Sequence, residues 1–297
     1  MAPIAIQPDR FHDGGTDTEP ADPSSPPRIV LERVLVGDVH RRTESFRMLR
    51  RIAYRDREHG VLLVPKDLGT FETDLTSVPT LFTWLVPRTG RHLPPALLHD
   101  GLVHGRHEEP TYVATAGDVI DRVEADRVFR AAMRDTDTGL VRSWLIWSAV
   151  TLGTIRAGST AWSRATHLRY LLAAAASLLV VAVLGVLATL DLFDVVDPLP
   201  WMGERSTGTE LVGGLAGAVV VPLLLGLTWG RFAVAGAISG IALAVLLHVT
   251  VVLALLTAAY QGAEWLARRR PLAAGAAAAA VVFALFVLVV LLVGPFR

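Results

Sequence analysis

The stretch Tyr170–Leu190, YLLAAAASLLVVAVLGVLATL, contains no charged residue. A helix needs about 20 apolar residues to cross the hydrocarbon core of a bilayer, so this stretch predicts a membrane span. Its backbone groups must be paired internally in lipid, which makes the span helical. Of the 56 charged residues, 43 lie in residues 1–167. This distribution excludes one soluble globule and also a wholly embedded protein, and it predicts a soluble half followed by a membrane half.

Further apolar segments follow the first span and complete a predicted transmembrane domain over residues 170–297. Two Gly-x-x-x-Gly pairs, Gly213/Gly217 and Gly236/Gly240, permit close helix packing, so a homo-oligomer through these spans is one expected association. A basic linker over residues 157–169 precedes this domain. The expectation is an all-α bundle of about four helices, at about 170–190, 211–229, 232–260 and 272–296.

The charges that flank the first span predict its orientation. Four arginines precede it, whereas the loop 191–210 carries five acids against Arg205 alone. Because basic flanks stay in the cytoplasm, we expect a multi-pass protein of the cell membrane whose N-terminal domain is cytoplasmic. Four spans would place Arg268–Arg270 on the opposite side, against this rule, so the number of crossings is the open point. The four arginines are Arg142, Arg156, Arg164 and Arg169.

Bulk composition narrows the chemistry of the soluble half. The formal net charge is zero and neither half is strongly biased, which gives no argument for nucleic-acid binding. The chain has no cysteine, which excludes disulfides, thiolate zinc sites and a cysteine nucleophile. Residues 1–27 contain six prolines and no apolar run, so they are expected to form a disordered tail rather than a signal peptide.

The fold predicted for residues 28–156 is α+β, with short antiparallel strands followed by about three helices. Period-two alternation and turn residues indicate the strands, and apolar periodicity with helix-breaking residues indicates the helices. The third helix, which carries Trp144 and Trp147, is either part of the core or an anchor at the membrane surface. The expected strands are 29–36, 46–54 and 61–64, and the expected helices are 93–104, 116–134 and 140–155.

Residues 41–57 contain seven arginines, with Arg41 and Arg57 at the two ends. Because the membrane is covalently near, one hypothesis is that they contact anionic lipid headgroups. The alternative is the solvated face of a strand pair, neutralised by neighbouring acids such as Glu44, Asp56 and Glu58.

A group of polar residues falls in apolar surroundings and is the candidate site. His99 and Asp100 lie within the apolar sequence 96–103, and a half-buried polar pair needs partners. Asp126 is either paired with Arg122 one helical turn away or turned inward toward His99. An imidazole with carboxylates suits general-base chemistry, and Asp74, Asp100 and Asp126 are candidate ligands for Ca²⁺, Mg²⁺ or Mn²⁺.

Four short blocks in this order resemble the DUF1353 family of phages and bacteria over about residues 46–156. They are Val64-Pro65, Thr73–Pro79, Ala96–Asp100 and Ala125–Met133. The family has no established activity, so the resemblance implies a fold and a polar cluster rather than a reaction. One departure is Val103, where the family usually carries a tyrosine. The positions that the resemblance singles out are Asp74, Ser77, His99, Asp100, Arg122 and Asp126.

Three functions remain open from the sequence. The favoured one is a membrane-anchored structural or interaction module whose polar cluster fastens the turn at residues 73–79 to the helices. The alternative is a membrane-tethered, metal-dependent hydrolase in which His99 activates water. A small transporter or channel is the third.

Overall fold

The computed structural model describes residues 10–36, 43–75, 85–87, 89–103, 109–160, 162–202, 206–270, 275 and 279. The chain forms two compact units, residues 1–245 and 246–297, and each is described by itself. The first unit holds an α+β domain with antiparallel strands, followed by apolar helices, which confirms the predicted fold class for this part of the chain.

Two small antiparallel sheets form the β part of the domain. The first has the order β1-β4-β5-β7, and the second has the order β2-β3-β6. Residue pairs such as Ile52 with Val64 and Leu31 with Met48 fix the registers. The strands are β1 (Phe11–Asp13), β2 (Leu31–Val36), β3 (Thr43–Met48), β4 (Ile52–Arg55), β5 (Val61–Val64), β6 (Glu72–Thr73) and β7 (Val113–Ala114).

The single strand predicted over 46–54 is wrong, because the chain changes sheets within it. β3 ends at Met48 and β4 begins at Ile52 in the other sheet. Between them, the Leu49 N–H donates to the Val30 carbonyl and the Arg51 N–H to the Gly15 carbonyl, so this short turn is tied to both sides.

The predicted disordered tail is also wrong for residues 10–27, while residues 1–9 lie outside the described part. Strand β1 pairs with β4, and the ring of Phe11 lies 4.7 Å from that of Tyr54. Arg50 holds Asp13 through two parallel contacts of 2.6 Å, and a third contact of 2.6 Å reaches Glu19. The four prolines within residues 10–27 therefore belong to an ordered, ion-paired segment.

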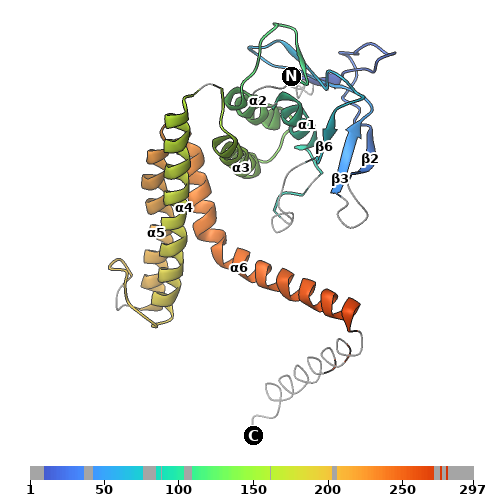
Figure 1. Ribbon diagram of the computed structural model, residues 1–297. Coiled ribbons are helices and arrows are strands. Elements are labelled where there is room, and N and C mark those ends of the chain that lie inside the picture. Colours follow the sequence, from blue (N-terminus) through green and yellow to red (C-terminus); the bar gives the residue numbers. More distant parts are fainter. Residues whose placement is uncertain are drawn as a thin grey trace, which may run out of the picture. The chain divides into compact units, whose positions relative to one another are not determined.

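Three helices complete the domain (Figure 1), with α1 against the sheets and α3 against α2, and all three were predicted from the sequence. They are α1 (Leu93–Leu102), α2 (Arg122–Asp135) and α3 (Leu140–Ala157). Helix α2 begins six residues later than expected because the Asp121 side chain caps it. Helix α3 buries Ile146 against Phe129 and Met133, so for this helix the core interpretation is confirmed.

Helix α1 lies very close to strand β5. A Cβ atom on Gly101 would lie only 2.2 Å from Val64 Cγ1, so a glycine is required at this contact. Leu97, Leu98 and Leu102 are fully buried in the same core. The core of the domain is thus built where α1 meets the first sheet.

The apolar helices that follow are α4 (Arg164–Leu192), α5 (Thr207–Gly226), the 3₁₀ helix η2 (Leu227–Phe232) and α6 (Ala233–Arg269). Two helices in the described residues are long and apolar enough to cross a membrane, α4 with 29 residues and the segment Gly208–Arg269 with 62. The expectation of four such helices is therefore corrected. Gly230, with φ +59°, interrupts the second segment between α5 and α6. Of the fourth predicted span, 272–296, only Gly275 and Ala279 belong to the described residues.

The paired glycines of these helices contact their own chain. A Cβ atom on Gly213 would lie 2.5 Å from the Trp201 carbonyl oxygen, and one on Gly240 would lie 2.7 Å from Pro222 Cβ. Gly236 approaches Trp229 in the same way, at 2.6 Å. These close contacts explain the glycines within one chain, so homo-oligomerisation stays a prediction without support from them.

The Arg50–Asp13 ion pair yields a stability prediction. Replacing Arg50→Ala leaves the carboxylate of Asp13, which is 3% exposed, without its guanidinium partner and should lower the free energy of unfolding. Urea unfolding of the full chain in detergent measures the change, and Arg57→Ala at an exposed position is the control.

The same pair predicts the pH dependence of that difference. The hydrogen bonds from Arg50 lower the pKa of Asp13, so the ion pair stabilises the fold above about pH 4 and its contribution disappears as the pH falls through the lowered pKa. The difference between Arg50→Ala and the unmodified chain should therefore shrink in acid. An equal difference at all pH values would contradict this account.

Candidate functional site

Helices α1 and α2 bring two of the predicted site residues together. His99 Nε2 lies 2.9 Å from Asp126 Oδ1, and Asp126 is 3% exposed. The His99 ring also stacks against Phe129, one helical turn after Asp126, with centroids 4.9 Å apart. The inward orientation of Asp126 is thus confirmed, and the Arg122–Asp126 pair is not formed among the described residues. Asp126 Oδ2 is buried and has no hydrogen-bond partner in that part of the chain.

Asp100 points to a different partner from its neighbour, as the 100° step of a helix requires. Its Oδ2 accepts a 2.6 Å hydrogen bond from the Thr73 hydroxyl at the end of β6. The same hydroxyl oxygen accepts the N–H of Leu75, whose φ is +71°. Burial raises the pKa of Asp100 to about 6, with a contribution from Asp74, while the Thr73 hydrogen bond and His99 oppose the shift.

The remaining predicted residues are more scattered. Asp74 is exposed beside Thr73, Arg122 is the first residue of α2, and Ser77 lies outside the described residues. Within the described ranges, Asp74, Asp100 and Asp126 do not form a group whose ligand atoms all lie within 4.8 Å of one another. The cluster is instead two hydrogen-bonded pairs, His99–Asp126 and Thr73–Asp100, which fasten α1 to α2 and to β6.

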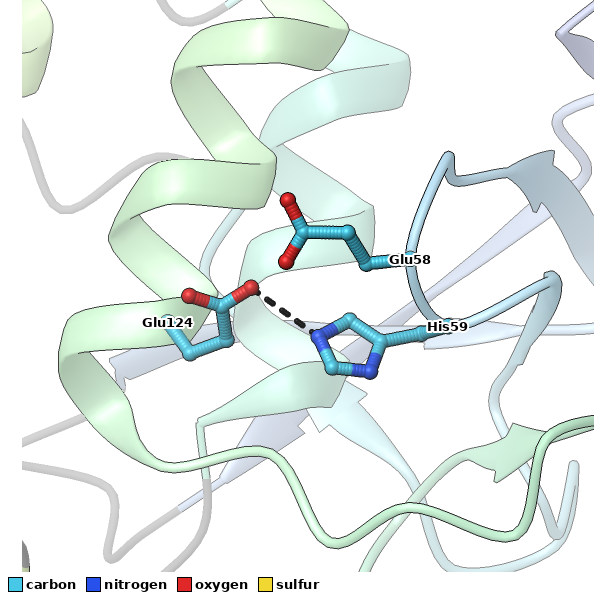
Figure 2. A group of neighbouring side chains, drawn as sticks. All are labelled: Glu58, His59 and Glu124. Atoms are coloured by element: carbon cyan, nitrogen blue, oxygen red, sulfur yellow. Dashed lines mark hydrogen bonds and ion pairs between the residues drawn. The ribbon is translucent and has the colours of Figure 1, made fainter.

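A second polar group does meet that distance criterion. Oxygen or nitrogen atoms of Glu58, His59 and Glu124 all lie within 4.8 Å of one another, and among the described residues this is the only such group. Figure 2 shows Glu58 and His59 on the turn between β4 and β5, facing Glu124 on helix α2.

The turn that carries Glu58 and His59 is fixed by its own sequence. Asp56 Oδ1 accepts the N–H groups of Glu58 and His59, at 2.9 and 3.2 Å. Gly60 closes the turn with φ +70°, and a Cβ atom there would lie 2.4 Å from Thr115 Oγ1. The backbone of this turn therefore positions the Glu58 and His59 side chains independently of their contacts with helix α2.

Helix α2 supplies the other wall. The Asp121 side chain accepts the N–H groups of Val123 and Glu124, which sets Glu124 in the first turn of the helix. Arg127 Nε donates to Glu124 Oε1 at 2.5 Å, and its Nη2 reaches Asp56 Oδ1 at 3.1 Å. The guanidinium therefore links the helix to the turn.

His59 lies between two carboxylates. Its Nδ1 is 2.7 Å from Asp118 Oδ2, and its Nε2 is 2.9 Å from Glu124 Oε1. Burial lowers the pKa of His59, but the hydrogen bonds to Asp118 and Glu124 and the nearby negative charges outweigh it, so the pKa of His59 is raised overall. The group around His59 was not predicted from the sequence. Its only local signal is the Asp-x-Glu-His pattern at 56–59.

The comparisons with known proteins match the domain and not the whole chain. Residues 46–150 match the family described as "Protein of unknown function (DUF1353)". The match contains the four blocks on which the resemblance was based, so that resemblance is confirmed for the domain. No curated protein and no solved structure matches the chain.

The raised pKa of Asp100 predicts how stability depends on pH. A buried carboxyl whose pKa lies near 6 in the fold and near 4 when unfolded stabilises the protein only while it is protonated, so stability falls between about pH 4 and pH 6, by up to roughly 3 kcal/mol. Asp100→Asn should remove this loss and unfold at higher urea than the unmodified chain at pH 7.5 but not at pH 4.

Urea unfolding at the two pH values measures the effect, with Glu32→Gln at a half-exposed ion pair as the control. An Asp100→Asn variant with the pH profile of the unmodified chain would show that Asp100 is not a buried acid.

Proposed function

We propose that the chain is a membrane-anchored protein that holds a DUF1353 domain at the cytoplasmic face of the cell membrane as a structural or interaction module. The observation that carries the proposal is the large apolar surface left exposed by the last helices. Leu172 and Leu179 on α4, Leu224 on α5 and Leu255 on α6 are each at least 60% exposed. Large apolar side chains exposed in this number are unfavourable in water and are expected where helices contact lipid.

The charges at the two ends of this bundle support the orientation. Arg169 lies beside Gly230, so the start of α4 and the turn that carries Arg231 share one end. At the other end of these helices lie Asp191, near the end of α4, and Glu210, in the first turn of α5. With arginines at one end and acids at the other, the basic end and the domain attached to it are proposed to be cytoplasmic.

The proposed role of the His99 cluster is to fasten the domain together. Each hydrogen bond joins elements distant in sequence, and both acids already have a donor. The hydrolase remains a second candidate because a buried carboxylate that orients an imidazole is also how general bases are held. The structural role is preferred because the three proposed metal ligands are not gathered into one group.

Single-cysteine labelling tests the anchor and its orientation. The chain has no cysteine, so each introduced cysteine is its one thiol, and labelling by a membrane-impermeant maleimide is read on the chain purified after the reaction. Thr18→Cys in the domain and Thr228→Cys in η2 should be labelled only after permeabilisation, whereas Val196→Cys should be labelled in intact cells; all three positions are exposed. Labelling of Thr18→Cys in intact cells would overturn the orientation.

Arg268→Cys tests how often the second apolar segment crosses. If α5 and α6 both cross, Arg268 lies outside and is labelled in intact cells; protection would mean that Gly208–Arg269 does not cross twice.

A double-mutant cycle separates the two roles of the His99–Asp126 pair. His99→Ala and Asp126→Ala should each lower the free energy of unfolding by about 1–3 kcal/mol, because each leaves a buried group unpaired, and the double variant should lose less than the sum. Urea unfolding of the full chain measures all three. Single variants as stable as the unmodified chain would refute the structural role and favour the hydrolase.

A further inference from the structure

A neutral His59 ring cannot satisfy both of its contacts with carboxylates. One of the two contacts therefore requires an added positive charge, either a proton or a metal ion. A neutral imidazole carries one N–H, which can serve only one of the two carboxylates. If Nδ1 donates to Asp118 at 2.7 Å, the lone pair of Nε2 faces the Glu124 oxygen at 2.9 Å. Two acceptors at this distance repel each other unless a proton or a metal ion is bound there.

The charge of the surroundings favours a divalent ion over a single proton. Asp56, Glu58, Asp118 and Glu124 bring four negative charges, and among the ion pairs of the described residues only Arg127 and a protonated His59 oppose them. A proton on His59 leaves a net charge of −2, whereas a divalent ion on neutral His59 leaves −1. Asp56 is 5% exposed, and its Oδ2 has no hydrogen-bond partner in the described chain, so the existing contacts leave this group under-satisfied.

The contact with Asp118 is of the kind that accompanies metal-bound histidine. A histidine that binds a metal through one ring nitrogen nearly always donates its other N–H to a carboxylate, carbonyl or water, which fixes the ring and its tautomer. Asp118 Oδ2 lies at hydrogen-bonding distance from Nδ1. Figure 2 shows the His59 ring with its other nitrogen turned toward Glu124. This arrangement is independent of the gathering of the three other side chains.

The spacing of the three side chains also fits. Atoms bound to one ion at about 2.1 Å lie no more than about 4.2 Å apart, so the observed spread within 4.8 Å requires only a small inward movement. Glu58 is able to make this movement, because its side chain is 65% exposed and its ion pair with Arg127 Nη2 is the longest of the group at 3.7 Å.

We propose that Glu58, His59 through Nε2, and Glu124 form a binding site for a divalent transition-metal ion, with Asp118 as the positioning carboxylate. One imidazole nitrogen with carboxylate oxygens favours Zn²⁺, with Mn²⁺ next, over Mg²⁺ or Ca²⁺, which prefer oxygen alone. Arg127 keeps its contact with Asp56 and lowers the remaining negative charge of the site. This metal site is distinct from the His99 cluster and does not depend on the membrane anchor.

Metal binding to the purified full chain in detergent, without a histidine tag, tests the proposal. After equilibrium dialysis against Zn²⁺, elemental analysis should find about one equivalent, and isothermal titration should show release of protons below pH 7 as the ion displaces the proton from His59. Affinity should decrease in the order Zn²⁺, Mn²⁺, then Mg²⁺ and Ca²⁺.

Variants locate the ion. Glu58→Gln disturbs the fold least and should lower the affinity for Zn²⁺ at least about tenfold. Asp118→Asn should lower it roughly 10- to 100-fold, because the His59 ring is then held less firmly. Glu109→Gln, at a carboxylate that is 91% exposed elsewhere in the domain, is the matched control and should bind as the unmodified chain does. Urea unfolding without metal confirms that each variant is folded.

Three results would overturn the proposal. One is the absence of stoichiometric Zn²⁺ in the unmodified chain, which would make the group a proton-held ion-pair network only. Another is unchanged affinity in both Glu58→Gln and Asp118→Asn. The third is loss of binding in Asp100→Asn with retention in Glu58→Gln, which would move the ion to the His99 cluster.

Discussion

The close approach of helix α1 to strand β5 is the constraint on which the rest of the domain depends. The helix backbone lies against Val64 at a distance that only Gly101 permits, and this contact carries the end of the helix into the interior. His99 and Asp100 are on that end, so their polar groups must find partners there. Asp126 and Thr73 supply these partners. The contact at Gly101 therefore fixes the positions of α2 and β6, because it places His99 and Asp100 where they must form these hydrogen bonds.

The sequence predicts the parts of this fold whose signals are local. The helices were predicted because apolar spacing and helix breakers such as Gly139 are local signals, and the contact of Asp126 with His99 was one of two alternatives that the sequence left open. The sheet change between Met48 and Ile52 was not predictable in this way. Both residues are fully buried and lie an even number of positions apart, so the alternation continues in phase through the turn. The order of residues 10–27 depends on Arg50, which lies far along the chain, and composition alone favoured disorder.

The two polar groups of the domain differ in how their charges are balanced, and this also decided which one was predictable. The His99 cluster has an apolar sequence around it, which makes its polar residues conspicuous. The group around His59 draws on the turn 56–60, on Asp118 and on α2, each of which is an ordinary polar surface segment when read alone. Only the pairing of β4 with β5, with α2 placed beside their turn, brings four carboxylates around one imidazole. The excess of negative charge around His59 arises only in the folded chain, so the spacing of residues in the sequence does not predict it.

The junction between the domain and the anchor has the composition expected of a membrane interface. Ile155 from α3 is buried with Tyr170, Trp229 and Phe232, and Trp162 packs edge-on against the Tyr170 and Phe232 rings at 5.3 and 5.7 Å. Arg169 and Arg231 lie over two of these rings, so the cluster is apolar inside and cationic at its edge. Aromatic side chains with an apolar body and a nearby charge are most stable where lipid meets water. The Trp229 indole N–H, which donates to Ser177 on α4 at 2.7 Å, ties η2 to the first apolar helix at this level. In the proposed anchor this cluster, rather than the tryptophans of α3, is the part suited to a membrane interface, because α3 is engaged in the core of the domain.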